Sequence, residues 1–263
     1  MFDFIDQIIT YIEGHELLFQ LVLTGIVSIL SALFGYYYFT LKDFFVRRRP
    51  LSRVFCFEKN STVYITSGDD PASGTDKPPI MQPGDVAALI ELYSTLRSNR
   101  KDLNVVYYPS GTLPADALDE NLISVGGPHS NSTTNLLLEK LSSSLNFDKK
   151  GRLLSPTLDK PLSFKAKGNT AVDYGFFIKS RNPFRSDESK YVYIIAGCET
   201  WGVLAAARRL SWLYAPTSIR KLAKLFKNKP IYQIVKTDMI NFHVTDISVV
   251  DQGTWPIETH VNL

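Results

Sequence analysis

The stretch YVYIIAGCETWGVLAAARRL, residues 191–210, decides the fold class. Its first six residues are all apolar or aromatic, which is typical of a strand covered on both faces of a sheet. Gly197 and Gly202 bracket a polar turn, and the apolar spacing over residues 203–214 then predicts a helix. A strand that passes through a glycine turn into a helix is typical of a parallel α/β sheet.

The same order of strand, turn and helix occurs earlier in the chain. Residues 121–125 form a short apolar strand that runs into Gly126-Gly127-Pro128 and then into an amphipathic helix at 136–145. Asp85 can cap a helix over residues 86–96. A long loop is predicted at 67–84, irregular structure with a hairpin at 146–170, and further strands at 52–57, 62–66, 104–108, 174–179, 231–236 and 243–250.

This alternation predicts a doubly wound, mainly parallel Rossmann-like sheet with antiparallel additions at an edge. No internal repeat or proline-rich linker divides residues 53–263, so we expect one domain there. The composition, 44% hydrophobic and 21% charged, excludes a disordered or collagen-like chain. A net charge of +3 does not favour nucleic acid as a partner. Cys56 and Cys198 lie in apolar runs, which indicates neither a disulfide framework nor a zinc site and is compatible with a reducing compartment.

Residues 17–41, LLFQLVLTGIVSILSALFGYYYFTL, contain no acidic or basic side chain. A helix of 25 residues is longer than a hydrocarbon core about 30 Å thick, so we predict a transmembrane helix; a buried core helix is the alternative. Acidic residues precede this segment and basic residues follow it, the reverse of a cleaved signal peptide. The positive-inside rule then predicts a single-pass protein of the inner cell membrane, with residues 1–16 outside, a basic linker at 42–52 and residues 53–263 in the cytoplasm.

Two further segments have amphipathic patterns, each with two interpretations. Residues 2–12 have the spacing of one apolar helical face, so they either lie along the outer membrane interface or simply extend the spanning helix. Residues 218–229 combine basic and apolar side chains at helical spacing. They form either a helix that contacts anionic lipid or an ordinary surface helix.

Two glycine turns, GGPHSN at 126–131 and GCETWG at 197–202, are the predicted binding site. In an open α/β sheet, ligands bind beyond the carboxyl ends of the strands, where helix N-termini present unpaired N–H groups. The structural alternative is that these glycines only let strand pass into helix. The indole of the second turn can likewise stack on a base or pack against the sheet. The predicted ligand-binding residues are Gly126, Gly127, Pro128, Asn131, Ser132, Lys179, Arg181, Gly197, Glu199, Thr200, Trp201 and Gly202.

Neither turn matches GxGxxG or GxxxxGK[ST], so no dinucleotide or NTP motif identifies the ligand. Lys179 and Arg181 come near the end of a neighbouring predicted strand. With backbone amides they would make a locally positive pocket, which favours an anion or a nucleotide. Solvated charge is the alternative for both residues.

The elements NLISVGGPHSN, YGFFIKSRNPF and YVYIIAGCETWGVLAAARRL, preceded by Asp85, resemble in their order an uncharacterised prokaryotic Rossmann-like module. That module pairs GGPxxN with a later NPF and an AG…WGT…AA element, and it recurs in proteins that look like regulators or membrane-tethered sensors. The resemblance covers roughly residues 60–210. Val203 stands where the pattern has Thr, which removes a hydroxyl from the turn. The resemblance implies sensing or ligand binding and supplies no established activity.

We therefore predict an anchored sensor of a small anionic or nucleotide-derived molecule that signals through homo-oligomerisation of its anchor, such as a prokaryotic nucleotide-signalling or defence effector. An anchored hydrolase of a nucleotide-like substrate, with His129 and Glu199 as an acid–base pair, and an interaction scaffold without ligand are the alternatives. The four histidines lack metal-ligand spacing and no GxSxG nucleophile occurs, so we expect neither a metal nor a cofactor.

Overall fold

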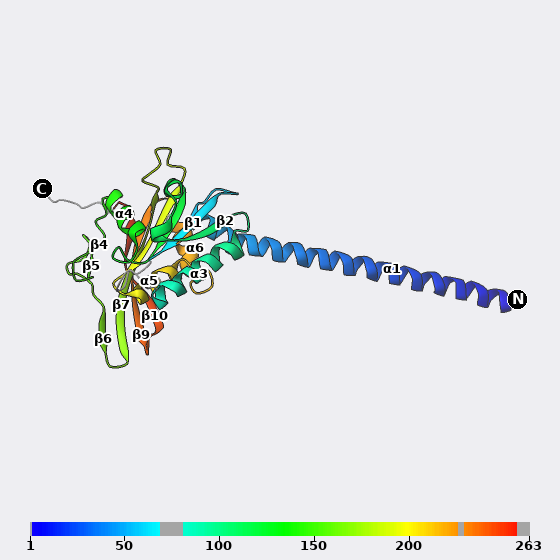
Figure 1. The fold of residues 1–263 in the computed structure, drawn as a ribbon. Helices are drawn as coiled ribbons and strands as arrows, with labels where there is room; N and C mark the ends of the chain where they lie inside the picture. The colour runs from blue at the N-terminus through cyan, green and yellow to red at the C-terminus, as the bar shows by residue number, and fades with distance from the viewer. Residues whose placement is uncertain (1, 69–80, 226–228, 257–263) are drawn as a thin grey trace. The chain divides into compact units, whose positions relative to one another are not determined.

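A computed structural model describes residues 2–68, 81–225 and 229–256. The chain divides into two compact units, residues 1–47 and 48–263. The first unit is essentially one helix, α1 (Phe2–Asp43), followed by a π-helical turn, η1 (Phe44–Arg48), at the boundary between the units (Figure 1).

Helix α1 carries its apolar side chains on the outside. Leu21 is 64% exposed and Phe34 is 74% exposed. The helical segment Gly14–Phe55 contains a window with a mean hydropathy of 2.3, none of it buried, so its length and composition suffice to cross a membrane. Residues 2–12 continue α1 without a break, in agreement with the prediction that they extend this helix.

The second unit opens with a helix where the sequence pattern predicted a strand at residues 52–57. Helix α2 (Arg49–Phe55) has a proline in its first turn, where a missing N–H costs nothing. Its buried residues Leu51, Val54 and Phe55 recur at helical spacing. The helix ends at Cys56, whose backbone is left-handed with φ 53°. The prediction was wrong because a short β-branched and aromatic run does not distinguish a strand from a buried helical turn.

One sheet of eight strands organises this unit. Strands β2 (Asn104–Pro109), β1 (Thr62–Ser67), β3 (Asn121–Val125) and β8 (Tyr191–Gly197) are neighbours in that order, and all are parallel. Beyond β8 come β7 (Thr170–Arg181), β9 (Ile231–Ile240) and β10 (His243–Thr254), each antiparallel to its neighbour, and β6 (Lys165–Lys167) pairs with β7. These pairings make β9 and β6 run in the same direction as β8, so the fold is a mixed α/β fold with a mostly parallel sheet.

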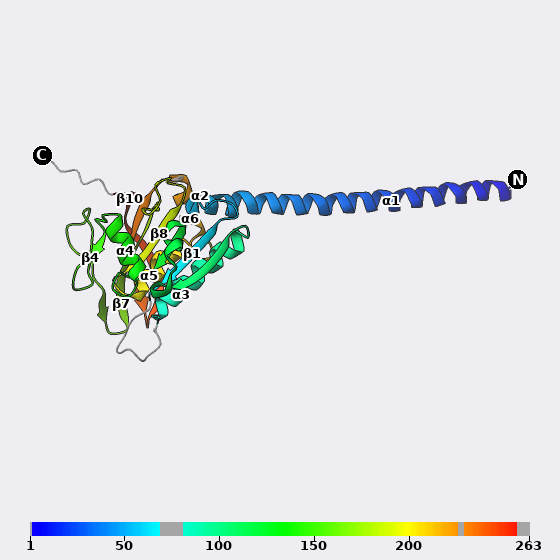
Figure 2. The ribbon, with the colours of Figure 1, turned by 45° about the horizontal axis from the view of Figure 1, so that its top comes forward.

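Helices cover both faces of the sheet, as the views of Figures 1 and 2 show. One apolar core joins the sheet to α2, α3 (Pro83–Asn99), α5 (Thr200–Arg209) and α6 (Pro216–Leu225). The other core joins the opposite face to α4 (Ser132–Lys140), the loop segment after it and the hairpin β4 (Asn146–Phe147) with β5 (Leu153–Leu154). Two short 3-10 helices, η2 (Ser110–Thr112) and η3 (Ala115–Asp119), lead from β2 to β3.

Strand β8 contributes alternate side chains to the two cores. Tyr193 and Ile195 pack in the first, and Ile194 and Ala196 pack in the second. All of Tyr191–Gly197 is buried. The prediction of a strand covered on both faces is confirmed, and the parallel strands β1, β3 and β8 therefore end at one edge of a sheet with helices on either side.

Candidate functional site

The two glycine turns lie side by side at the carboxyl edge of the sheet. Their strands, β3 and β8, are paired in parallel, and the N–H of Gly126 donates to the carbonyl of Ile195 at 2.9 Å. A Cβ placed on Gly127 would lie 3.8 Å from the carbonyl oxygen of Gly197. Strand β1 ends there too, since the N–H of Gly68 donates to the carbonyl of Val125 at 3.3 Å. We call these converging ends of β1, β3 and β8 the glycine edge.

The N-termini of α3 and α5 are joined at the glycine edge by a reciprocal pair of hydrogen bonds. The N–H of Asp85 donates to Oγ1 of Thr200 at 2.9 Å, and this hydroxyl donates to Oδ1 of Asp85 at 2.9 Å. Gly84 makes the close contact feasible, because a Cβ there would lie 2.3 Å from the carbonyl oxygen of Thr200. The hydroxyl of Thr200 thus has a structural role, and Asp85, predicted as a helix cap, instead connects two helices.

Asp173, near the start of β7, caps α5 from a neighbouring strand. Its Oδ1 accepts the N–H groups of Tyr174 at 2.8 Å and Glu199 at 3.2 Å, and its Oδ2 accepts the N–H of Gly202. The carboxyl is fully buried. The sequence pattern did not identify this residue, because a cap is normally sought just before the helix and Asp173 lies 26 positions upstream of Glu199.

Both buried carboxyl groups hold protons more tightly than usual. Burial raises the pKa of Asp173 to about 7, against the opposing effect of its three backbone N–H donors, and the Glu199 charge adds a smaller increase. Burial likewise raises the pKa of Asp85 to about 6, while the Thr200 hydrogen bond lowers it. Near neutral pH the glycine edge therefore carries partial negative charge from its buried groups.

Lys179 and Arg181 do not belong to the glycine edge, so the predicted positive pocket is wrong. Strand β7 is antiparallel to β8, and Arg181 is paired with Tyr191, the first residue of β8. Both basic residues consequently lie at the opposite edge of the sheet. The guanidinium of Arg181 donates to the carbonyl of Glu188 at 2.6 Å and lies 4.3 Å from the centroid of the Tyr191 ring.

In the GGPHSN turn, most of the predicted ligand-binding residues have local structural roles. Asn131 is buried, its Oδ1 accepts the N–H of Thr134 at 3.0 Å, and its amide donates to the carbonyl of Val125 at 2.9 Å. It is the N-cap of α4. Gly126 has φ 108°, a conformation that favours glycine. Pro128 is half-buried, and His129 and Ser132 are exposed.

Gly127 differs from the other glycines of the two turns. Among residues 2–68, 81–225 and 229–256, the only neighbour within 4 Å of an added Cβ is the Gly197 carbonyl oxygen at 3.8 Å, so a side chain would meet no close contact with this part of the chain. An added Cβ on Gly197 would lie 2.5 Å from the N of Val203, and one on Gly202 would lie 2.2 Å from the carbonyl oxygen of Tyr174. Gly197 and Gly202 are therefore required by packing between strands and α5.

Glu199 and Trp201 of the second turn differ in exposure. Glu199 is exposed, whereas Trp201 is half-buried, packs against the first apolar core and stacks on Phe242 with ring centroids 6.5 Å apart. The described side chains of His129 and Glu199 share neither a hydrogen bond nor an ion pair, so no acid–base pair is assembled between them. Within residues 2–68, 81–225 and 229–256, no three His, Cys, Asp or Glu side chains are grouped to hold a metal.

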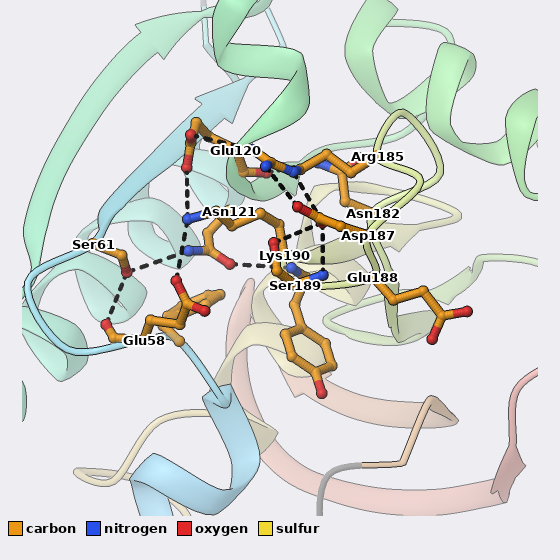
Figure 3. A network of polar contacts seen from close by, with 12 residues as sticks. Glu58, Ser61, Glu120, Asn121, Asn182, Arg185, Asp187, Glu188, Ser189 and Lys190 are labelled. Carbon is orange, nitrogen blue, oxygen red and sulfur yellow. Dashed lines mark hydrogen bonds and ion pairs between the residues drawn. The ribbon is translucent and has the colours of Figure 1, made fainter.

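The Asn-Pro-Phe motif lies at the opposite edge, within the polar network of Figure 3. The Asn182 amide donates to the carbonyls of Leu118 at 2.8 Å and Glu120 at 2.6 Å, and its Oδ1 accepts the N–H of Phe184 at 2.9 Å. Lys190 and Arg185 add ion pairs to Glu120 at 3.1 and 3.7 Å. These contacts attach the loop after β7 to the start of β3, which is a structural role.

No protein-family model and no curated protein matches the chain. The resemblance to a Rossmann-like sensor module stays a prediction, and the case for function depends on the geometry of the glycine edge.

Proposed function

We propose that this protein is a single-pass protein of the cell membrane whose cytoplasmic α/β domain binds a small anionic or nucleotide-derived ligand at the glycine edge. The observation that carries this proposal is the space over Gly127, into which no other described residue reaches, on a turn adjacent to the N-terminus of α5. Ligands of open α/β sheets bind at such parallel strand ends. The long exposed apolar helix supports the anchor, and the basic residues that follow it support the cytoplasmic orientation.

Backbone groups supply the donors for the anionic part of the ligand. In the described part of the chain, no acceptor engages the N–H of Gly127 or the N–H of Thr200. These two groups belong to neighbouring turns, and the second lies in the first turn of α5, where the helix dipole favours negative charge. Because Lys179 and Arg181 lie elsewhere, amides rather than side-chain cations would neutralise the ligand.

Carboxylates nearby favour a ligand that also carries hydroxyl groups. The Glu199 side chain is exposed in the turn, and Oδ2 of Asp85 lies 3.1 Å from the Cβ position of Gly126. Carboxylates accept hydrogen bonds from ribose hydroxyls in many dinucleotide sites. A phosphorylated nucleoside satisfies both kinds of group, whereas a simple inorganic anion would meet unfavourable charge.

Titration calorimetry on the full chain in lipid nanodiscs tests the binding proposal. A set of mononucleotides, cyclic nucleotides and dinucleotides is titrated against the wild-type chain and against Gly127→Val. The valine fills the open space without a backbone clash, so we expect at least about a tenfold loss of affinity, equivalent to about 1.4 kcal/mol. Ala166→Val, which introduces the same side chain on the exposed strand β6, should leave affinity unchanged.

Two outcomes would overturn the proposal: no binding by any nucleotide of the set, or equal affinity of the Gly127→Val and wild-type chains. Signalling through the anchor adds a second measurement. The strip of Ser28, Ser31 and Ala32 lets helices approach closely, so the ligand should raise the fraction of cross-linked oligomers in nanodiscs. If oligomers form equally with and without ligand, the proposal that the anchor signals by oligomerisation is wrong, whereas the proposal that the domain binds a ligand is unaffected.

A further inference from the structure

Lys179 is a fully enclosed lysine whose ammonium points at a sulfur. The side chain lies in β7 and is 1% exposed. Its Nζ donates to Sγ of Cys56 at 2.9 Å and lies 5.1 Å from the centroid of the Tyr191 ring. In the described part of the chain, no carboxylate is within ion-pair distance of Lys179. This is unusual, because buried charges in proteins are normally paired with an opposite charge.

Cys56 is held in place opposite this amine. Its backbone N–H donates to the carbonyl of Ser52 at 3.0 Å, and its left-handed φ of 53° ends α2. Its thiol donates to the carbonyl of Arg53 at 2.9 Å. The residue is half-buried, so it is more accessible to a small oxidant than Lys179, which is almost completely enclosed.

The environment of Lys179 favours a reactive amine. Burial lowers its pKa, an effect that the nearby sulfur partly opposes. A lower pKa increases the fraction of neutral amine, which is the nucleophilic form. Sulfenic acids condense with thiols and with nitrogen nucleophiles, and here the nitrogen is already within reach of the sulfur.

We propose that Cys56 and Lys179 form a reversible covalent cross-link when the protein meets a peroxide. The thiol first reduces hydrogen peroxide, so that the O–O bond breaks and Cys56 becomes a sulfenic acid with release of water. The neutral amine of Lys179 then attacks this sulfur; the S–N bond forms, the S–O bond breaks, and hydroxide leaves with the amine proton as a second water. The sulfur supplies both electrons, and the product is a sulfenamide that a thiol reductant returns to cysteine and lysine.

The second cysteine is an internal control for this chemistry. Burial raises the pKa of Cys198 to about 12, so it carries little reactive thiolate at neutral pH. Its thiol donates to the carbonyl of Leu162 at 3.5 Å, and the described contacts bring no lysine to it. Peroxide should therefore act at one cysteine of the two.

The cross-link would tie the end of the first helix of the α/β unit to strand β7 of its sheet. Cys56 directly follows α2, Lys179 lies in β7, and the two are 123 positions apart in the chain. Closing so long a loop restricts the unfolded chain, so the oxidised protein should melt at a higher temperature than the reduced protein. The inference does not depend on the ligand proposed for the glycine edge.

Peptide mapping by mass spectrometry of the full chain in nanodiscs tests the proposal, with hydrogen peroxide as the oxidant. The expected product joins VFCFEK (residues 54–59) to GNTAVDYGFFIKSR (residues 168–181), because trypsin cannot cleave after a modified Lys179. Its mass should be about 2 Da below the sum of the two peptides, since two hydrogens are lost. Dithiothreitol should restore both peptides and reverse the rise in melting temperature.

Variants separate the cross-link from other oxidation. Cys56→Ser and Lys179→Met should each abolish the joined peptide, and Lys179→Met should leave Cys56 to proceed to sulfinic acid. Cys198→Ser and the exposed Lys165→Met should leave the joined peptide unchanged. The proposal is wrong if Lys179 of the peroxide-treated wild-type protein stays unmodified while Cys56 becomes sulfinic acid, pairs with another cysteine or stays reduced. This test uses the wild-type protein alone, so it does not depend on whether any variant folds.

Discussion

Asp173→Asn should remove much of the pH dependence of the stability of the α/β unit. The native carboxyl is fully buried, accepts two backbone N–H groups at the start of α5 and a third from Tyr174 in β7, and has a pKa of about 7. In the unfolded chain an aspartate has a pKa of about 3.9. The folded state therefore keeps a proton that the unfolded state has already released, so the stability gained from that proton is present at low pH and lost as pH rises through about 7.

The size of this effect follows from the two pKa values. Each pH unit over which only the folded state is protonated is equivalent to about 1.36 kcal/mol. Between pH 5 and pH 8, Asp173 should lower the free energy of unfolding by about 2–3 kcal/mol. Asp85, with a pKa of about 6, should add about half as much, and this smaller part remains in the Asp173→Asn protein.

Urea denaturation of the full chain in detergent micelles at pH 5, 6, 7 and 8, followed by tryptophan fluorescence, measures the dependence. Wild-type stability should fall over this range, and the Asp173→Asn protein should show less than half of that fall. Asp159→Asn, at an exposed position, should behave like the wild type. Equal falls in the wild-type and Asp173→Asn proteins would refute the reasoning, because Asp173 would then be ionised in the folded protein at pH 5 despite its burial.

Three further changes test the packing and the anchor. Gly202→Ala places a methyl group 2.2 Å from a backbone oxygen of β7, so we expect a loss of about 1–3 kcal/mol in urea denaturation, whereas Gly127→Ala should stay close to the wild type. Asn182→Ala removes three hydrogen bonds and should lower the melting temperature by several degrees, equivalent to about 2–3 kcal/mol of unfolding free energy. An unchanged melting temperature would show that these hydrogen bonds do not hold the loop after β7. The double substitution Ile26→Arg and Leu30→Arg adds about 5–7 kcal/mol to the free-energy cost of inserting α1 into a membrane. Alkaline carbonate should therefore extract this variant from membranes, and membrane retention equal to that of the wild type would argue against a spanning α1.

Local patterns in the chain predicted much of the fold. The apolar run at 191–196 identified a strand covered on both faces, and the strand–glycine–helix order at β3 and β8 identified two parallel strands of one sheet. These features depend on the spacing of apolar and turn residues along a short segment, so they can be seen without the rest of the molecule. The prediction failed at α2, where six residues were too few to distinguish the two periodicities.

The site depended on strand direction, which the sequence does not specify. Lys179 and Arg181 lie at the carboxyl end of a predicted strand, as the glycine turns do, yet β7 is antiparallel to β8, so this end lies at the other edge of the sheet. Asp173 and Asp85 were undetectable as partners of α5 for the same reason, since their contacts cross from one element to another. By itself the sequence determined most of the helices and strands, the apolar helix and the glycine turns, because each is a local property. Only the tertiary structure decided which ends of these elements meet. That depends on the order and direction of the strands, which are brought together by burial of the shared core.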